Sequence, residues 1–165
     1  MKQVVYNKNK AIEYARKWAY SRNPKYYNFD LIGGDCTNFV SQCIFEGCPI
    51  MNVTKDIGWY YKNGNDKSPS WTGVQFLYNF LTKNYSVGPY GKQVEMKELQ
   101  EGDIVQLSFN SQYFSHSLIV TKVEKVGMLD GIRVASHTED NFNKKLNEYN
   151  FQKIRFVHIE GGRSF

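Results

Sequence analysis

The sequence contains no uninterrupted apolar run of about 18 residues, the length that a membrane-spanning helix needs. It also lacks zinc-finger spacing, basic-aromatic repeats, internal repeats and low-complexity segments. These absences argue against a membrane-spanning protein and against a nucleic-acid-binding one. The net charge of +5 is spread along the chain, so it indicates solubility first and attraction to an anionic cell wall second.

No signal peptide is predicted, because the N-terminal stretch MKQVVYNKNK has no apolar segment of sufficient length. As it stands the chain is expected in the cytoplasm, whereas a trimmed or mature form would fit an extracellular or cell-wall location. The length of 165 residues and the 41% apolar content predict one globular domain over residues 1–165. We expect it to be a monomer.

The sequence has only three cysteines, and their number and spacing do not match a disulfide framework. Cys36, Cys43 and Cys48 are odd in number, which argues against complete disulfide pairing. Their spacing does not match zinc-ligand pairs and no histidine lies nearby, so we predict no metal ion and no other cofactor. Cys43 and Cys48 are expected to be structural, and only Cys36 has an unusual position.

Apolar periodicity predicts helices over residues 9–19 and 36–46, and a third helix that begins at an N-cap on Ser70. Residues 51–69 are expected to form a long functional loop. Strands are predicted over 104–107, 117–123, 132–137 and 153–159, and residues 141–150 as a short helix or a loop. Helices followed by a meander of strands indicate an α+β fold, with N-terminal helices packed on an antiparallel β-sheet.

The stretch GGDCTNFVSQC places Cys36 in the first turn of a helix. Free backbone N–H groups and the helix dipole there favour a thiolate, and the same N–H groups can stabilise an oxyanion. Gly33 and Gly34 allow a sharp turn and leave room for a substrate. Asp35 would oppose the thiolate unless it points away. The alternative is a buried structural cysteine at a helix start.

A catalytic cysteine needs a base, and the sequence has only three histidines. Strand alternation puts His116 on the same face as Leu118 and Val120, which predicts that it points towards the helices and Cys36. The alternative for His116 is a histidine at the edge of the core. His137 ends the neighbouring strand and is the expected partner of His116, with Asp140 as its rival. The third histidine, at position 158, is expected to be structural.

These motifs together resemble known cysteine hydrolases. Cys36 in GGDCTNFVSQC, the turn Gly102-Asp103 before IVQL, and His116 in HSLIV resemble the NlpC/P60 and CHAP cysteine peptidase superfamily. More narrowly, the resemblance over about residues 7–157 is to the putative amidase domain family of Gram-positive bacteria. Its motifs are DCTNFVSQ, Asn23-Pro24, Trp71 and the segment His137-Thr138.

The resemblance implies a papain-like, NlpC/P60-type core in which Cys36 is the nucleophile and His116 the general base. His137 would be the third catalytic residue, with Asp140 as the alternative. The oxyanion hole would comprise the Cys36 backbone N–H and a side chain upstream. Asp30 stands where that side chain is expected but cannot donate when ionised, which leaves Tyr27 and Asn28 as candidates.

Aromatic residues after position 58 are candidates for one wall of the substrate cleft, Trp59 and Trp71 foremost, with ordinary core packing as the alternative. The function so predicted is a cysteine-dependent amidase or peptidase that hydrolyses an amide through a thioester. The expected partner is a peptide-type amide, with the peptidoglycan stem peptide as the candidate substrate. Two other functions remain open: a non-catalytic module that binds wall peptide, and an acyltransferase that uses the same Cys-His pair.

Overall fold

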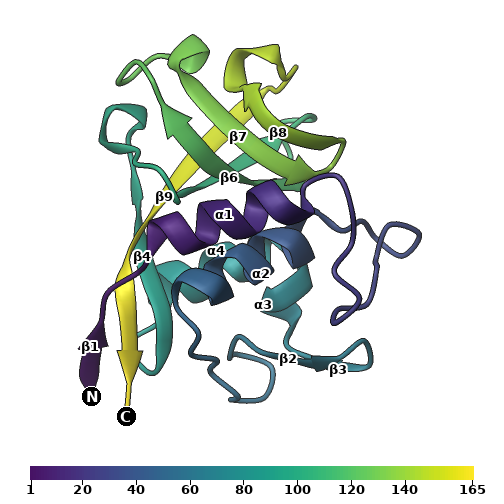
Figure 1. Ribbon diagram of the computed structural model, residues 1–165, viewed down its shortest axis with the longest axis vertical. Helices are drawn as coiled ribbons and strands as arrows, with labels where there is room; N and C mark the ends of the chain where they lie inside the picture. The colour runs from purple at the N-terminus through teal and green to yellow at the C-terminus, as the bar shows by residue number, and fades with distance from the viewer.

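The computed structural model describes residues 1–165 and contains a seven-stranded antiparallel sheet with helices against one face (Figure 1). The strand order is β1-β9-β5-β6-β7-β8, and β4 pairs with β9. The strands of this sheet are β1 (Lys2–Val4), β4 (Gly88–Val94), β5 (Ile104–Ser108), β6 (His116–Val123), β7 (Ile132–His137), β8 (Asp140–Lys145) and β9 (Lys153–Ser164). A separate hairpin consists of β2 (Tyr61–Asn63) and β3 (Asp66–Lys67).

Four α-helices precede most of the sheet: α1 (Lys8–Trp18), α2 (Cys36–Gly47), α3 (Pro69–Thr72) and α4 (Val74–Lys83). The side chain of Asn7 caps α1 by accepting a hydrogen bond from the Lys10 N–H at 3.1 Å. Three single turns of 3-10 helix lie between strands: η1 (Met96–Glu98), η2 (Leu129–Gly131) and η3 (Leu146–Glu148). None of the helices is long and apolar enough to cross a membrane.

The predicted third helix is divided at Gly73, which has an extended backbone and ends α3. The prediction that Ser70 caps this helix is wrong, because Ser70 lies inside α3 and α4 begins only at Val74. A β-carbon at position 73 would lie 2.9 Å from the carbonyl oxygen of Pro69. This close approach of backbone explains the need for glycine at the point where the extended conformation interrupts the helix.

Both faces of the sheet are apolar. Alternate side chains of one face pack on the helices, as Ile104, Ile119 and Ala135 do together with Phe39 of α2. The other face forms a second core around Leu118. The members of this second core are Leu99, Val105, Leu107, Leu118, Val120, Ile132, Val134, Leu146 and Phe156. Strands buried on both faces have nearly continuous apolar sequences, so their sequence alone does not tell which residues face the helices.

The longest strand, β9, holds the sheet together. Its first half pairs with β5, and its second half lies between β4 and β1. The pairing of β1 with the end of β9 brings the two ends of the chain side by side (Figure 1).

The expected α+β fold, with N-terminal helices on an antiparallel sheet, is confirmed. The helices α1 and α2 and the strands β5, β6 and β7 match their predicted ranges within one or two residues. The sequence did not predict β1, β4 or the β2–β3 hairpin, which lies in the expected long loop. Most of the segment that was predicted as a helix or a loop forms β8, an edge strand of polar sequence, followed by η3.

Candidate active site

Cys36 is the first residue of α2 and is only partly buried. Its Sγ lies 3.7 Å from the hydroxyl of Thr37 and 3.9 Å from the carbonyl oxygen of Ser115, just before β6. The backbone N–H groups of Cys36 and Thr37 have no acceptor within the protein, as is usual in a first helical turn. The thiol therefore stands beside free donors at the positive end of a helix.

The approach to Cys36 is a turn at Gly33 and Gly34, with φ angles of 81° and 97°. These left-handed conformations are unfavourable for residues that have a β-carbon. A β-carbon at either position would meet no atom within 4 Å, so the backbone conformation, and not a lack of space, favours glycine in this turn.

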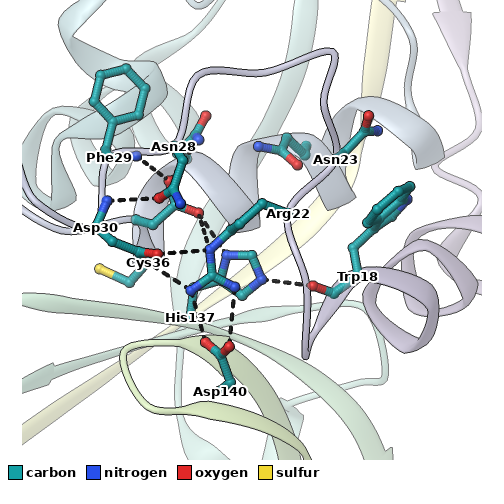
Figure 2. A network of polar contacts seen from close by, with 12 residues as sticks. Trp18, Arg22, Asn23, Asn28, Phe29, Asp30, Cys36, His137 and Asp140 are labelled. Carbon is teal, nitrogen blue, oxygen red and sulfur yellow. Dashed lines mark hydrogen bonds and ion pairs between the residues drawn. The ribbon is translucent and has the colours of Figure 1, made fainter.

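Asp35 is the N-cap residue of α2, and its carboxylate turns away from the thiol. It accepts hydrogen bonds at 2.9 Å from the backbone N–H of Phe29 and from the side-chain amide of Asn38. Burial opposes ionisation of Asp35, but hydrogen bonds from His137, Asn38 and Phe29 hold its pKa below the usual value. Figure 2 shows the Cys36 sulfur pointing away from the polar network that this carboxylate joins. Asp35 therefore opposes a thiolate at Cys36 less than it would if its carboxylate faced the sulfur.

His137 is the main partner of Asp35. Its Nδ1 lies 2.6 Å from Asp35 Oδ2, and its Nε2 lies 2.7 Å from the carbonyl oxygen of Trp18 (Figure 2). Both ring nitrogens therefore have an oxygen partner within hydrogen-bond distance. His137 is buried and packs against the ring of Phe39, at 4.0 Å between ring centroids.

This geometry corrects the predicted role of His137 as the partner of His116. Both of its ring nitrogens are occupied by Asp35 and Trp18, and its side chain faces the helices. Asp140 does not reach His116 either, because its carboxylate pairs with Arg22 at 2.9 Å. Arg22 also contacts Asp30 at 3.0 Å and, through Nε, the buried carboxylate of Asp35 at 3.6 Å, so its guanidinium joins three carboxylates (Figure 2).

His116 begins β6, and its Nδ1 lies 3.0 Å from the hydroxyl of Thr138. Its ring packs edge-on against Phe109, at 4.7 Å between ring centroids. Partial burial lowers the pKa of His116 below the usual value, which favours the neutral imidazole that a general base requires. Its other ring nitrogen, Nε2, has no partner within the protein.

The predicted facing of His116 towards the helices is wrong. Ser117 is the β6 residue that contacts α2, through a hydroxyl pair of 3.0 Å with Thr37, whereas Leu118 packs in the second core. Cys36 Sγ instead contacts the carbonyl oxygen of Ser115, the residue before His116, at 3.9 Å. The structure has no hydrogen bond between Sγ and the His116 ring. Such contacts are often long before substrate binds.

The two predicted oxyanion donors do not contact Cys36. The side-chain oxygen of Asn28 accepts a hydrogen bond from the N–H of Asp30 at 2.9 Å. The backbone carbonyl of Tyr27 accepts a hydrogen bond from Asn38, and its half-exposed ring packs on Phe29. The free backbone N–H groups of Cys36 and Thr37 are therefore the candidate donors that remain.

The prediction that Trp59 and Trp71 form one wall of the substrate cleft is wrong. Both are completely buried, with ring centroids 4.6 Å apart. Their indole N–H groups donate to Ser41 and Asn38 of α2, at 3.1 and 3.0 Å. They act as core residues that hold α2 in place, as the alternative interpretation of these aromatics expected.

The remaining sequence candidates have structural surroundings. Cys43 and Cys48 are buried, and burial raises the pKa of both thiols, that of Cys48 to about 11. His158 pairs with the buried Asp103 at 3.0 Å, as expected of a structural histidine. No group of three or more His, Cys, Asp or Glu residues is arranged to hold a metal ion.

The fold and the site define an α+β protein with a partly exposed cysteine at a helix start and a histidine at the start of an adjacent strand. The chain belongs to the family described as "Putative amidase domain", whose model matches residues 5–159. This membership indicates amide hydrolysis in general.

A relative from Bacillus subtilis (strain 168), "Uncharacterized protein YhbB", is 33% identical over 127 residues. The match covers 74% of this chain and 39% of the relative. The chain thus spans well under half the length of that protein. No solved structure matches the chain.

Proposed function

We propose that the protein is a cysteine-dependent amidase or peptidase of papain-like arrangement, with Cys36 as the nucleophile and His116 as the general base. The observation that carries the proposal is the contact of Cys36 Sγ with the Ser115 carbonyl at 3.9 Å, one residue before His116. Membership of the amidase family supports amide hydrolysis, and the partly exposed thiol at a helix start supports a cysteine mechanism.

The proposed reaction has two steps. His116 takes the proton of the Cys36 thiol while the sulfur attacks the carbonyl carbon of the amide. The imidazolium returns this proton to the departing nitrogen, the C–N bond breaks, and a thioester remains. His116 then takes a proton from water, the resulting hydroxide attacks the thioester, and the carboxylic acid leaves as the thiol is restored.

The negative oxygen of each tetrahedral intermediate needs donors close to the sulfur. We assign this task to the backbone N–H groups of Cys36 and Thr37, which have no acceptor within the protein. Preorganised donors of this kind lower the barrier because they need no rearrangement during the reaction. Neither Tyr27 nor Asn28 is required for this assignment.

Thr138 takes the role that the sequence assigned to His137. Its hydroxyl lies 3.0 Å from Nδ1 of His116 and can fix both the ring orientation and the tautomer, which leaves Nε2 free to exchange protons. A hydroxyl supplies no negative charge, so Thr138 acts as a positioning residue. His137 instead contacts Asp35, the residue before α2, and so joins that helix to the sheet.

The proposed substrate is a peptide-type amide, with peptidoglycan stem peptide as the first candidate. The test is incubation with muropeptides of defined stem peptide, followed by liquid chromatography and mass spectrometry. We expect cleavage by the wild type, a loss of at least about 100-fold in Cys36→Ala and His116→Ala, and retention in Cys43→Ala, which removes a buried thiol.

Each other outcome of this assay contradicts the proposal in its own way. Cleavage that persists in Cys36→Ala would remove the cysteine mechanism. Products that carry an added amine such as glycinamide, in place of hydrolysis, would identify an acyltransferase. Binding of muropeptides without any product would identify a binding module.

A further inference from the structure

The guanidinium of Arg155 on β9 is a partly buried positive charge without a carboxylate partner. Its Nε and Nη2 donate to the side-chain oxygen of Gln106 at 2.9 and 2.6 Å, and Nη2 also donates to that of Gln75 at 3.1 Å. No Asp or Glu side chain forms an ion pair with it, and Nη1 has no acceptor at all. Partly buried charges are ordinarily paired, so this cation has unused capacity for an anion.

Two aromatic rings hold the guanidinium in a fixed plane. Its central carbon lies 3.7 Å from the ring centroid of Tyr78 on α4 and 4.0 Å from that of Phe114. Stacking on both sides restricts the side chain, so little conformational entropy remains to be lost when the edge of the guanidinium binds a ligand. A planar fork of N–H donors matches the two oxygens of a carboxylate.

Arg155 belongs to the surroundings of Cys36. Phe114, which stacks on the guanidinium, is followed directly by Ser115, whose carbonyl oxygen contacts Cys36 Sγ. Gln106 also links the two sites, because its amide donates at 3.2 Å to Ser117, whose hydroxyl contacts Thr37 next to the thiol. The arginine is therefore connected to the candidate nucleophile along two routes.

The sheet register gives the length of this connection. Arg155 is opposite Gln106, and Gln106 is opposite Ser117, so Arg155 and Ser117 are two strands apart. Two strand spacings amount to about 10 Å. An extended peptide spans such a distance with about three residues.

We propose that Arg155 is a specificity-determining residue that binds a carboxylate of the substrate, located within about three residues of the scissile carbonyl. This inference rests on the proposed function and names its substrate class: peptide amides that carry an anionic group near the cleaved bond. The carboxylate would accept from the two N–H groups of Nη1, because Gln106 and Gln75 already accept from Nε and Nη2.

The test uses alkylation of Cys36, which needs a thiol but no turnover. Iodoacetyl-glycine and iodoacetyl-glycylglycine are compared with their uncharged carboxamides, and the rate of Cys36 modification is measured by mass spectrometry. Each rate is divided by that for iodoacetamide, which corrects for any change in the thiol itself. In the wild type we expect at least one carboxylate probe to react about tenfold faster than its carboxamide.

In Arg155→Gln this ratio should fall to about one, and Arg155→Lys should keep part of it because the charge remains without the fork. The matched control is Arg163→Gln, which removes the same charge from the same strand. Arg163 also stacks on a tyrosine, Tyr90, at 3.6 Å, and it donates to the carbonyl of Asn84. We expect the wild-type ratio in this control.

A ratio near one for every probe in the wild type, or an unchanged ratio in Arg155→Gln, would overturn the inference. A ratio that falls equally in Arg163→Gln would do so too, because it would show only the general positive charge of the protein. Failure of the proposed function would appear elsewhere, as muropeptide cleavage that survives Cys36→Ala. Thermal unfolding of each variant verifies that it is folded.

Discussion

His137 Nδ1 and Asp35 Oδ2 lie 2.6 Å apart, and both side chains are almost completely inaccessible to solvent. The pair joins the end of β7 to the residue that precedes α2. Through Nε2 of His137 it also reaches the last residue of α1. Three elements that meet at the candidate active site are thus connected by one imidazole ring and one carboxylate, and the position of Cys36 depends on both.

Removing His137 should destabilise the protein strongly. His137→Ala leaves the carboxylate of Asp35 buried without its main partner, and loss of one member of a buried pair typically costs about 3–5 kcal/mol. Urea unfolding followed by circular dichroism measures this free energy. Asp140→Asn is the control, since it removes one partly exposed partner of Arg22 but leaves the contacts of Asp35 with His137 and Arg22 in place, and should cost about 1 kcal/mol or less. Similar losses in both variants would contradict the assignment of His137 to a buried ion pair.

Asp35 should make stability depend on pH in the acid range. Because its pKa is lowered in the folded protein, its stabilising contribution is complete above the unfolded value of about 4. The contribution is lost as the pH falls through the lower, folded value. Free energies of unfolding measured between pH 6 and pH 2 should therefore fall less steeply in Asp35→Asn than in the wild type.

Asp103 provides a control of opposite sign for this pH dependence. Burial raises its pKa, so protonation of Asp103 favours the folded state as the pH falls. Asp103→Asn should consequently steepen the acid loss of stability. If both variants changed the slope in the same direction, the opposite pKa shifts of the two carboxylates would be refuted.

The three cysteines should differ sharply in reactivity. Cys36 is partly exposed, whereas burial raises the pKa of Cys43 and Cys48 and shields both. Iodoacetamide at mildly acidic pH should label Cys36 at least about tenfold faster than the other two, measured by peptide mapping. Equal labelling in the folded protein would remove the main support for a catalytic cysteine. Labelling in urea, where all three thiols are accessible, controls for differences in their intrinsic reactivity.

Thr138→Val should lower turnover about fivefold, the effect of one ordinary hydrogen bond of about 1 kcal/mol. The dependence of turnover on pH distinguishes a positioning role of Thr138 at His116 from a purely structural role. Since burial lowers the pKa of His116, the wild-type acid limb should lie below the usual histidine value of about 6.5. Thr138→Val should move this limb, and Thr138→Ser should restore it. A reduced rate with an unmoved limb and no rescue by serine would contradict the role of Thr138.

The sequence was sufficient for the elements that have one clear period. The helix after Cys36 and the strand after His116 were both predicted near their observed bounds. The edge strands β1, β4 and β8 were missed, the last two for clear physical reasons. β8 has the polar sequence DNFNKK because it buries little, and β4 begins with glycine and proline.

The candidate site was predicted only in part. The stretch HSLIVTKV is apolar on both faces, so alternation could not tell which face contacts the helices, and the wrong one was chosen for His116. Thr138 was missed as a partner because β8 was not recognised. Without β8, the short turn between β7 and β8 was not expected either. This turn contains Thr138 and places its hydroxyl next to His116. A threonine directly after a predicted strand end was the available signal.

The position of β9 has a consequence for synthesis on the ribosome. This strand pairs with β1, β4 and β5, and it follows every other strand in the chain. The helices and the β5–β8 meander can form while the chain grows, but β1 and β4 have no partner in the main sheet until β9 emerges. Their exposed edges are a temporary risk of aggregation, and slow synthesis of β9 would prolong it.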